Sequence, residues 1–225
     1  MHAAAPVARQ HLSPGDLPRH RHGAAYLTLV VSGGYEEAGD RGRWRVQPGD
    51  VIVHRAFEAH LNRVRAATGV VNLPLDEDEL PPFGRIGDLD AVVRALADPA
   101  EALARVRAQF TPLTPPVLDW PDDLARALGE AEPGALGAWA RTRRLSPEHV
   151  ARGFRQVFGV APRRFRAEAR AQAALRDLAE TDAPLAAIAA ARGFADQPHM
   201  TRAVAALTGR TPGAWRRSTG FKTGA

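Results

Sequence analysis

The chain has 225 residues, and 45% of them are apolar, so it can form one large or two small domains with a real core. It contains no cysteine, which excludes a disulfide framework, a zinc ribbon and a thiol nucleophile. The net charge of +5 is divided unevenly. Residues 136–225 hold 16 basic and 6 acidic residues, a net +10, whereas residues 1–135 hold the remaining 14 and 19, a net −5.

The basic half is almost entirely arginine, because Lys222 is the only lysine in the chain. Arginine binds phosphates and guanine edges bidentately, so this concentration of charge indicates a polyanionic partner. A general preference for arginine codons would explain the missing lysine but not the position of the charge. The most apolar run, Leu27–Val31, is far shorter than the ~20 residues that span a bilayer. We therefore expect a cytoplasmic protein without membrane contact.

The first predicted elements are short strands separated by turns. Each segment is rich in strand-forming residues or alternates polar and apolar residues, and Gly33 and Pro48-Gly49-Asp50 mark two of the turns. The predicted strands are Tyr26–Val31, Arg43–Val46, Val51–Val53, Asn62–Arg65 and Gly69–Val71. Strands of this length and spacing predict a small antiparallel β-barrel or jelly roll.

Two helices are predicted next, one behind an Asp88 cap and one beginning at Asp98-Pro99. Their apolar stripes could complete the core of the β-domain or form a dimer interface. The proline-rich stretch that follows, Thr111–Pro116, is typical of a linker. The predicted organisation is α+β with two domains: residues 1–112, a linker at 113–118, and an all-α domain over 119–225.

A shift of 50 residues aligns the second half of the chain with itself. Apolar positions stay apolar in both copies, and each copy has a glycine stop followed by a proline. The identical pairs are His149/His199, Arg152/Arg202, Gly159/Gly209, Pro162/Pro212 and Arg166/Arg216. The joint preservation of these features indicates an internal duplication.

Each copy has the layout of a helix-turn-helix. In the first copy the helix Ala135–Arg141 precedes a turn, and a second helix begins after Ser146 and ends at Gly159. In the second copy Pro184–Arg192 precedes the turn, and the next helix runs from an Asp196 cap to Gly209. Between the copies, residues 163–180 predict one helix of roughly 27 Å. Two reading helices on one face of a duplex lie about 34 Å apart.

Residues from about 119 to 217 resemble the DNA-binding domain of AraC/XylS-type transcription regulators. The resemblance is carried by the runs Leu185–Ala189, Arg192–Arg202, Gly209–Pro212 and Trp215–Arg217, and in the earlier copy by Leu145–Pro147 and Phe158–Pro162. It implies two helix-turn-helix units joined by a long helix and entering successive major grooves of double-stranded DNA. The chain departs from the usual pattern at Val204, where the family commonly has phenylalanine, and in its alanine-rich first short helix, which suggests weaker packing.

The expected DNA-reading residues lie on the exposed face of each second helix. They are Glu148, Ala151, Arg152 and Arg155 in the first copy, and Gln197, His199, Thr201 and Arg202 in the second. Arg152 and Arg202 occupy equivalent positions and are the best candidates for bidentate contacts to guanine. Any single arginine here could instead be a solvated charge or a phosphate contact. Val150, Phe154, Met200 and Val204 should face the core.

The first half resembles a cupin-like sensor, which AraC-type regulators commonly carry. His20-Arg21-His22 precedes the first predicted strand, and His60 follows the turn at Pro48-Gly49-Asp50. Cupins that bind metal usually have a carboxylate four residues after the second histidine, where this chain has Tyr26. The resemblance implies a ligand-responsive pocket whose expected effector-binding residues are His20, His22, Tyr26, Trp44 and His60.

The histidines leave three readings open. His20, His22 and His60 could hold a divalent metal ion, could hydrogen-bond an effector, or could cap loops at the mouth of the barrel. The leading hypothesis is a sequence-specific transcription regulator that responds to a small-molecule effector and is not an enzyme. Such a regulator requires no cofactor. RNA polymerase and a second copy of the chain are further expected partners. The alternatives are a metal-dependent cupin enzyme with a basic appended domain, and a non-specific nucleic-acid binder.

Overall fold

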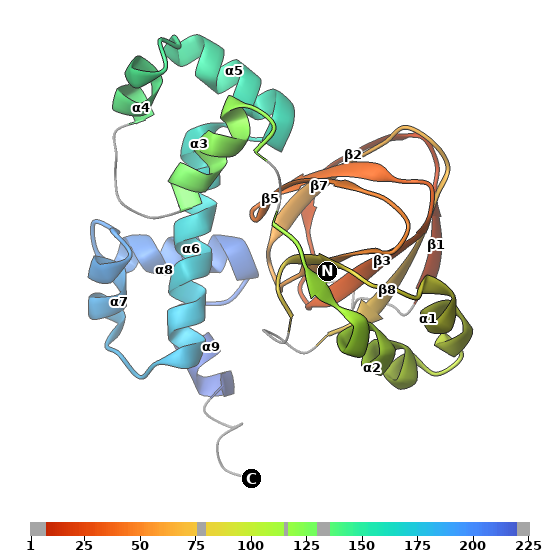
Figure 1. Cartoon of the computed structure of the whole chain (residues 1–225). Coiled ribbons are helices and arrows are strands. Elements are labelled where there is room, and N and C mark those ends of the chain that lie inside the picture. The colour runs from red at the N-terminus through yellow and green to blue at the C-terminus, as the bar shows by residue number, and fades with distance from the viewer. Residues whose placement is uncertain (1–7, 76–79, 115–116, 130–135, 220–225) are drawn as a thin grey trace. The chain divides into compact units, whose positions relative to one another are not determined.

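The structure, a computed structural model, describes residues 8–75, 80–114, 117–129 and 136–219. The chain divides into two compact units, residues 1–122 with 157–159, and residues 123–156 with 160–225. Strands and two short helices make up the first unit, and helices make up the second (Figure 1). This confirms the predicted α+β class. Within the described ranges, no helix has the length and apolar character needed to cross a membrane.

The first unit contains two antiparallel sheets. The larger has the order β1-β8-β3-β6-β9-β10 and the smaller the order β2-β7-β4-β5, and no described strand pairs across from one sheet to the other. Of the two architectures expected, a barrel or a jelly roll, the two separate sheets fit a jelly roll and not a closed barrel. The strands are β1 (Ala8–Leu12), β2 (Gly15–Arg21), β3 (Tyr26–Ser32), β4 (Tyr35–Gly39), β5 (Gly42–Val46), β6 (Asp50–His54), β7 (Ala59–Val64), β8 (Thr68–Pro74), β9 (Phe83–Arg85) and β10 (Thr111–Pro112).

Side chains of the larger sheet alternate between two buried faces, which explains why its strands are nearly continuous apolar runs. On β3, Leu27 and Leu29 face a core that includes Val92 and Val106 of the helices α1 (Leu89–Ala95) and α2 (Pro99–Gln109). Val30 faces the other core, between the two sheets. α1 and α2 were expected either to complete the core of the β-domain or to form a dimer interface. Their buried side chains complete the core.

Both predicted caps of these helices are present. The Asp88 carboxylate accepts a hydrogen bond from the Ala91 amide at 2.8 Å, and the Asp98 carboxylate accepts from the amides of Ala100 and Glu101 at 2.9 and 3.3 Å. Because these carboxylates satisfy otherwise unpaired N–H groups, they fix where each helix begins.

Several strands escaped prediction because their residues are poor strand formers. β2 contains Pro18, which is tolerated because β2 is an edge strand with a register shift between Leu17 and His20. His20 and Arg21 therefore lie within a strand rather than before the first one. β10 likewise places Thr111 and Pro112, expected near the linker, against β9 at a sheet edge.

A buried ion pair ties β5 to the chain segment that leads out of the first unit. The Arg43 guanidinium donates to both oxygens of Asp122, at 3.0 and 2.7 Å, and to Asp119 at 2.8 Å. Asp122 lies in the first turn of α3 (Trp120–Gly129), and its carboxylate also accepts from the Leu118 amide at 2.9 Å. The arrangement is charge-assisted and bidentate, so it fixes Asp119 and Asp122 on β5 within the first unit.

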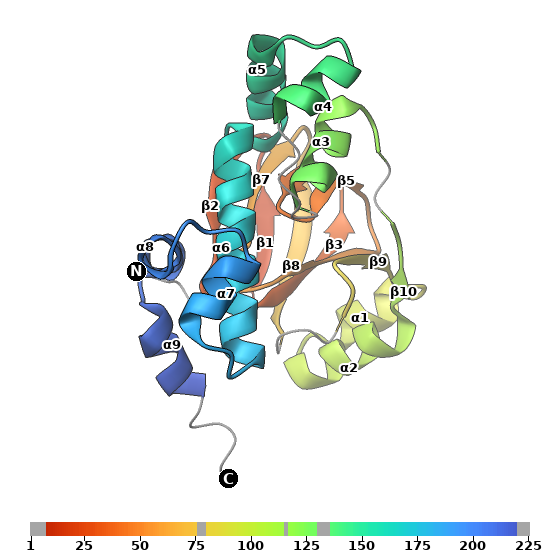
Figure 2. The same ribbon diagram turned by 90° about the vertical axis from the view of Figure 1, so that its left-hand side faces the viewer.

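The second unit confirms the internal duplication. The second helices of the two copies, α5 (Pro147–Phe158) and α8 (Gln197–Thr208), each have 12 residues and begin 50 positions apart. The helices that follow them, α6 (Pro162–Glu180) and α9 (Pro212–Thr219), also begin 50 positions apart. The first helices of the copies are α4 (Leu136–Thr142) and α7 (Leu185–Ala191). The long α6 packs against α7, α8 and α9 (Figure 2).

The predicted start and stop signals of α5 and α8 are also present. The Ser146 hydroxyl accepts from the His149 amide at 3.2 Å, and the Asp196 carboxylate accepts from the His199 amide at 2.6 Å. Gly159 and Gly209 follow these helices with φ angles of 74° and 76°, in the left-handed region that favours glycine. The four residues expected in the core, Val150, Phe154, Met200 and Val204, are all buried.

Candidate nucleic-acid interface and candidate effector pocket

The face of α5 opposite its core carries the residues expected to read DNA. Glu148, Arg152 and Arg155 are exposed, and Ala151 is half-buried. Hydrogen bonds from the Glu148 backbone amide and from Ser146 lower the pKa of the Glu148 carboxyl. Glu148 therefore helps to secure the start of α5, which is a structural role beside the expected reading role.

The equivalent face of α8 carries Gln197 and Arg202, both exposed, with His199 and Thr201 half-buried. The His199 ring packs edge-on against Phe194, with ring centroids 5.3 Å apart. Arg202 occupies the same position in α8 that Arg152 occupies in α5. Exposed guanidinium groups on a helix surface can reach base edges or phosphates in a major groove.

Two arginines outside the expected DNA-reading set, Arg170 and Arg192, stabilise the turn of the second helix-turn-helix. Arg192, just after α7, donates to both carboxylate oxygens of Asp177 on α6, at 2.6 and 2.5 Å. Arg170 on α6 donates to the Gly193 carbonyl at 2.8 Å, and its guanidinium carbon lies 5.4 Å from the centre of the Phe194 ring. These contacts join residues 15 and 23 positions apart, so helical periodicity carries no sign of them.

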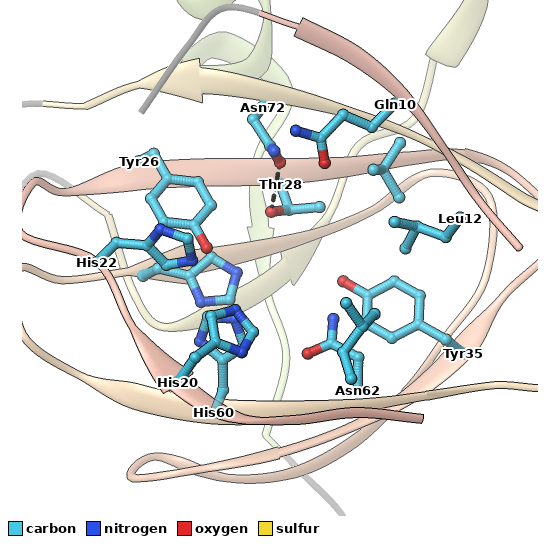
Figure 3. A pocket seen from close by; sticks show the side chains of 13 residues that line it. Gln10, Leu12, His20, His22, Tyr26, Thr28, Tyr35, His60, Asn62 and Asn72 are labelled. Carbon is cyan, nitrogen blue, oxygen red and sulfur yellow. Dashed lines mark hydrogen bonds between the residues drawn. The ribbon is translucent and has the colours of Figure 1, made fainter. Parts of the chain in front are cut away.

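The first unit contains a partly open cavity of about 130 Å³ between its two sheets. Four of the five residues expected to bind an effector line it: His20, His22, Tyr26 and His60. Figure 3 shows these four gathered at one end, with Thr28, Asn72 and Gln10 on another part of the wall. The Thr28 hydroxyl donates to the Asn72 side-chain oxygen at 2.8 Å.

Trp44, the fifth expected residue, does not line this cavity. Its ring lies 4.1 Å from that of Phe83, centre to centre, and only 4% of the residue is exposed. The alternation of β5 places Trp44 in the apolar core between the sheets, together with Val46. Trp44 therefore does not line this cavity, but it borders a smaller cavity beside Glu37, His54 and His60.

His54 is the main pocket residue that sequence reasoning missed. It lies directly opposite Tyr26 in the pairing of β3 with β6, and the two rings stack with centres 4.5 Å apart. Its ring centre is also 4.4 Å from that of His60. The signal was available in the alternation of β6, because Ile52 faces the core between the sheets and His54, two residues on, shares that face.

Burial makes this cluster electrically neutral. Desolvation raises the pKa of the Glu37 carboxyl to about 8, and it lowers the pKa of His54 to about 3, with the charges of His22 and His20 adding to the effect. Desolvation also holds the pKa of His60 well below its ordinary value. At neutral pH these imidazoles are unprotonated, so their nitrogens can accept a hydrogen bond or bind a metal ion.

Two sets of side chains in the cluster have the spacing of metal ligands. The first set is His20, His22 and His60. The second set is Glu37, His54 and His60. Within each set the possible ligand atoms lie within 4.8 Å of one another. Tyr26 stands where metal-binding cupins usually have a carboxylate, and burial raises the pKa of its phenol, so it remains neutral. The first set therefore offers only imidazole nitrogens, whereas the second includes a carboxyl.

The family comparison matched residues 139–218, which fit the profile described as "Helix-turn-helix domain". No match was found among curated protein sequences. Among solved structures, the C-terminal domain of AraT, a response regulator from Geobacillus stearothermophilus, is 21% identical, with a TM-score of 0.41 over 44% of this chain and 84% of AraT.

Two further solved structures are similar to the chain at low identity. ToxT from Vibrio cholerae O395 is 9% identical, with a TM-score of 0.45 over 96% of this chain and 97% of ToxT. A probable AraC family transcriptional regulator from Rhodopseudomonas palustris CGA009 is 20% identical, with a TM-score of 0.39 over 43% of this chain and 97% of its own.

The assignment depends on the matched profile and on the duplicated geometry, since these likenesses are remote. The profile match covers α5 to α8 and reaches into α4 and α9. Within it lie both capped second helices, both glycine stops and the connecting α6. We therefore identify residues 139–218 as a helix-turn-helix domain that contains two helix-turn-helix units joined by α6.

Proposed function

We propose that α5 and α8 read base edges in successive major grooves of one operator, and that the cavity in the first unit binds a small effector that controls this reading. The observation that carries the proposal is the pair Arg152 and Arg202. Both are exposed, and they occupy the same position on two 12-residue helices that begin 50 residues apart. A duplicated reading unit of this kind suits two neighbouring turns of B-form DNA.

The two helices differ in what they offer to bases. α8 presents Gln197 and Arg202, two side chains that suit adenine and guanine edges. On α5, Ala151 offers only a methyl group and Glu148 supports the helix start. The proposal therefore assigns more of the base reading to α8, and makes Arg152 the main base contact of α5.

The cavity favours a small, polar and uncharged effector. Its volume of about 130 Å³ is below the ~300 Å³ at which pockets for drug-sized ligands begin. Its wall combines imidazoles, of which the buried His54 and His60 are neutral, with the hydroxyl and amide groups of Thr28, Asn62 and Asn72. Such a ligand controls DNA reading only if it binds one arrangement of the protein better than another.

The other parts of the proposal follow from the AraC/XylS resemblance. The first unit acts as a cupin-like sensor, the chain works in the cytoplasm without a catalytic activity, and it requires no cofactor to read DNA. RNA polymerase and a second copy of the chain are its proposed protein partners. The spacing of half-sites in the operator would report the number of chains that bind.

Selection of bound fragments from a random duplex library, with the full chain, tests the proposal. We expect one enriched motif with two contacted segments. Arg152→Ala and Arg202→Ala should each cost about 1–3 kcal/mol of binding and relax the preference at one base pair, in different segments. Arg94→Ala, at an exposed arginine of α1, is the control and should select the unchanged motif.

Two results would contradict this proposal. A library that yields no enriched motif would leave only charge-driven, non-specific binding. Variants that weaken all sequences equally would make Arg152 and Arg202 phosphate anchors, not base readers.

A further inference from the structure

The cluster around His60 contains polar atoms that the rest of the protein does not satisfy. Among the described residues, Glu37 Oε2 and His60 Nδ1 are buried and have no hydrogen-bond partner. A buried polar group without a partner costs roughly 1–3 kcal/mol. Two such atoms in one cluster, from β4 and β7 of the same sheet, indicate that the site normally holds something that the protein chain does not supply.

The surroundings of these atoms fit a cation. Glu37, His54 and His60 are all buried, and they border a cavity of about 20 Å³, the size of one water molecule or one ion. The donor atoms of the three residues lie within 4.8 Å of one another. Ligands placed ~2.1 Å from a tetrahedral zinc ion are about 3.4 Å apart, so side-chain rotations that bring these atoms closer by up to about 1.4 Å would complete the site.

The neighbouring charged groups leave Glu37 available. Glu58 and Arg41 both border the small cavity, and they form an ion pair with each other at 2.5 Å, which neutralises both charges. Tyr35 donates a hydrogen bond to Glu37, which leaves the other carboxyl oxygen free for an ion. Both histidines are neutral, as metal ligands must be, and an ion would displace the proton that burial keeps on Glu37.

We propose that Glu37, His54 and His60 bind one first-row transition-metal dication, with Zn²⁺ or Co²⁺ as suitable occupants. Two imidazoles and one carboxylate form a donor set that such ions prefer. This set differs from the three histidines at the larger cavity, His20, His22 and His60, because it takes its carboxylate from β4 and a histidine from β6. The proposal is independent of how α5 and α8 read DNA.

Co²⁺ binding to the full chain, after removal of metals with a chelator, tests the site. We expect one ion per chain by equilibrium dialysis, with visible absorption bands typical of low coordination number. Glu37→Gln and His54→Gln should each weaken Co²⁺ binding by about 100-fold or more, because loss of a ligand exceeds the 10–100-fold effect of an outer-shell change. Glu36→Gln is the matched control on the same strand and should leave affinity unchanged. It removes a carboxylate that pairs with Arg45 and Arg63.

Proton NMR of the Co²⁺-loaded wild type provides a second test that needs no variant to fold. Two strongly shifted exchangeable imidazole signals are expected, one for each histidine ligand. Three such signals, or loss of binding in His20→Gln and His22→Gln while Glu37→Gln and His54→Gln still bind, would place the ion at the other histidines and overturn the proposal. Absence of stoichiometric binding would also overturn it and leave the small cavity to a water molecule.

Discussion

At the scale of single residues, the turn of the second helix-turn-helix requires a glycine for its backbone conformation alone. Gly193 has a φ of 68°, and a Cβ added there would meet no atom within 4 Å. Gly193→Ala should therefore destabilise the protein by about 1–2 kcal/mol through left-handed strain without a clash. Urea unfolding of the full chain measures this loss.

Gly213→Ala is the control for that experiment. Gly213 lies in α9 with an ordinary helical φ, and a Cβ there would be 3.6 Å from the nearest atom, a nitrogen of Arg217. Alanine is the better helix former, so this variant should equal or exceed the wild type in stability. Equal destabilisation by both substitutions would contradict the strain argument for Gly193.

The pocket residues show which single-residue features a sequence reveals. His20, His22, Tyr26 and His60 were found by their motif spacing and do line the cavity. The alternation of β6 shows that His54 shares a face with Ile52, but the place of His54 and Glu37 beside His60 depends on which strands pair and in which register. β4 pairs with β7, whereas His54 reaches the cluster from the opposite sheet. Local sequence patterns do not predict which distant strands pair or in which register.

At the scale of elements, α8 depends on its N-terminal cap. Asp196 accepts a hydrogen bond from the His199 amide and sits next to Gln197, the first residue of the helix. Asp196→Ala should cost about 1 kcal/mol of stability and fray the first turn. Faster amide hydrogen exchange at His199, together with weaker binding to the selected operator, is the expected result.

Ser146→Ala tests the same position in the other copy, since Ser146 caps α5 through the His149 amide. It should fray α5 and leave exchange in α8 unchanged. Asp182→Ala removes an exposed carboxylate between α6 and α7 and controls for the loss of charge. Unchanged exchange at His199 in Asp196→Ala would show that packing, not the cap, fixes the start of α8.

Helices were predicted closely because their signals are local. Ser146, Asp196, Gly159 and Gly209 each act within one turn of their own helix, and all four have the expected conformation or contact. Strands were predicted less well. β2 contains a proline and β4 contains two glutamates, and whether a strand tolerates such residues depends on its position in the sheet. β2 is such a case: it contains Pro18, and only its edge position permits that.

At the scale of the whole molecule, the separation of charge predicts how salt acts on DNA binding. Residues 136–225 carry a net +10 and residues 1–135 a net −5, so phosphate contacts should come from the second half. Binding to the selected operator and to a scrambled duplex should both weaken as salt rises, because both release condensed counterions. The preference for the operator should persist, because base contacts release no counterions.

Titrations of both duplexes over a series of salt concentrations measure this. The wild type should keep its ratio of affinities for operator and scrambled duplex at every salt concentration, while Arg202→Ala should lower that ratio by about 5- to 150-fold, the equivalent of losing 1–3 kcal/mol of base discrimination. Arg94→Ala, in the acidic half, should change neither the ratio nor the salt dependence. A wild-type preference that disappears as salt rises would mean that charge alone drives recognition, and that the outward-facing arginines of α5 and α8 do not read sequence.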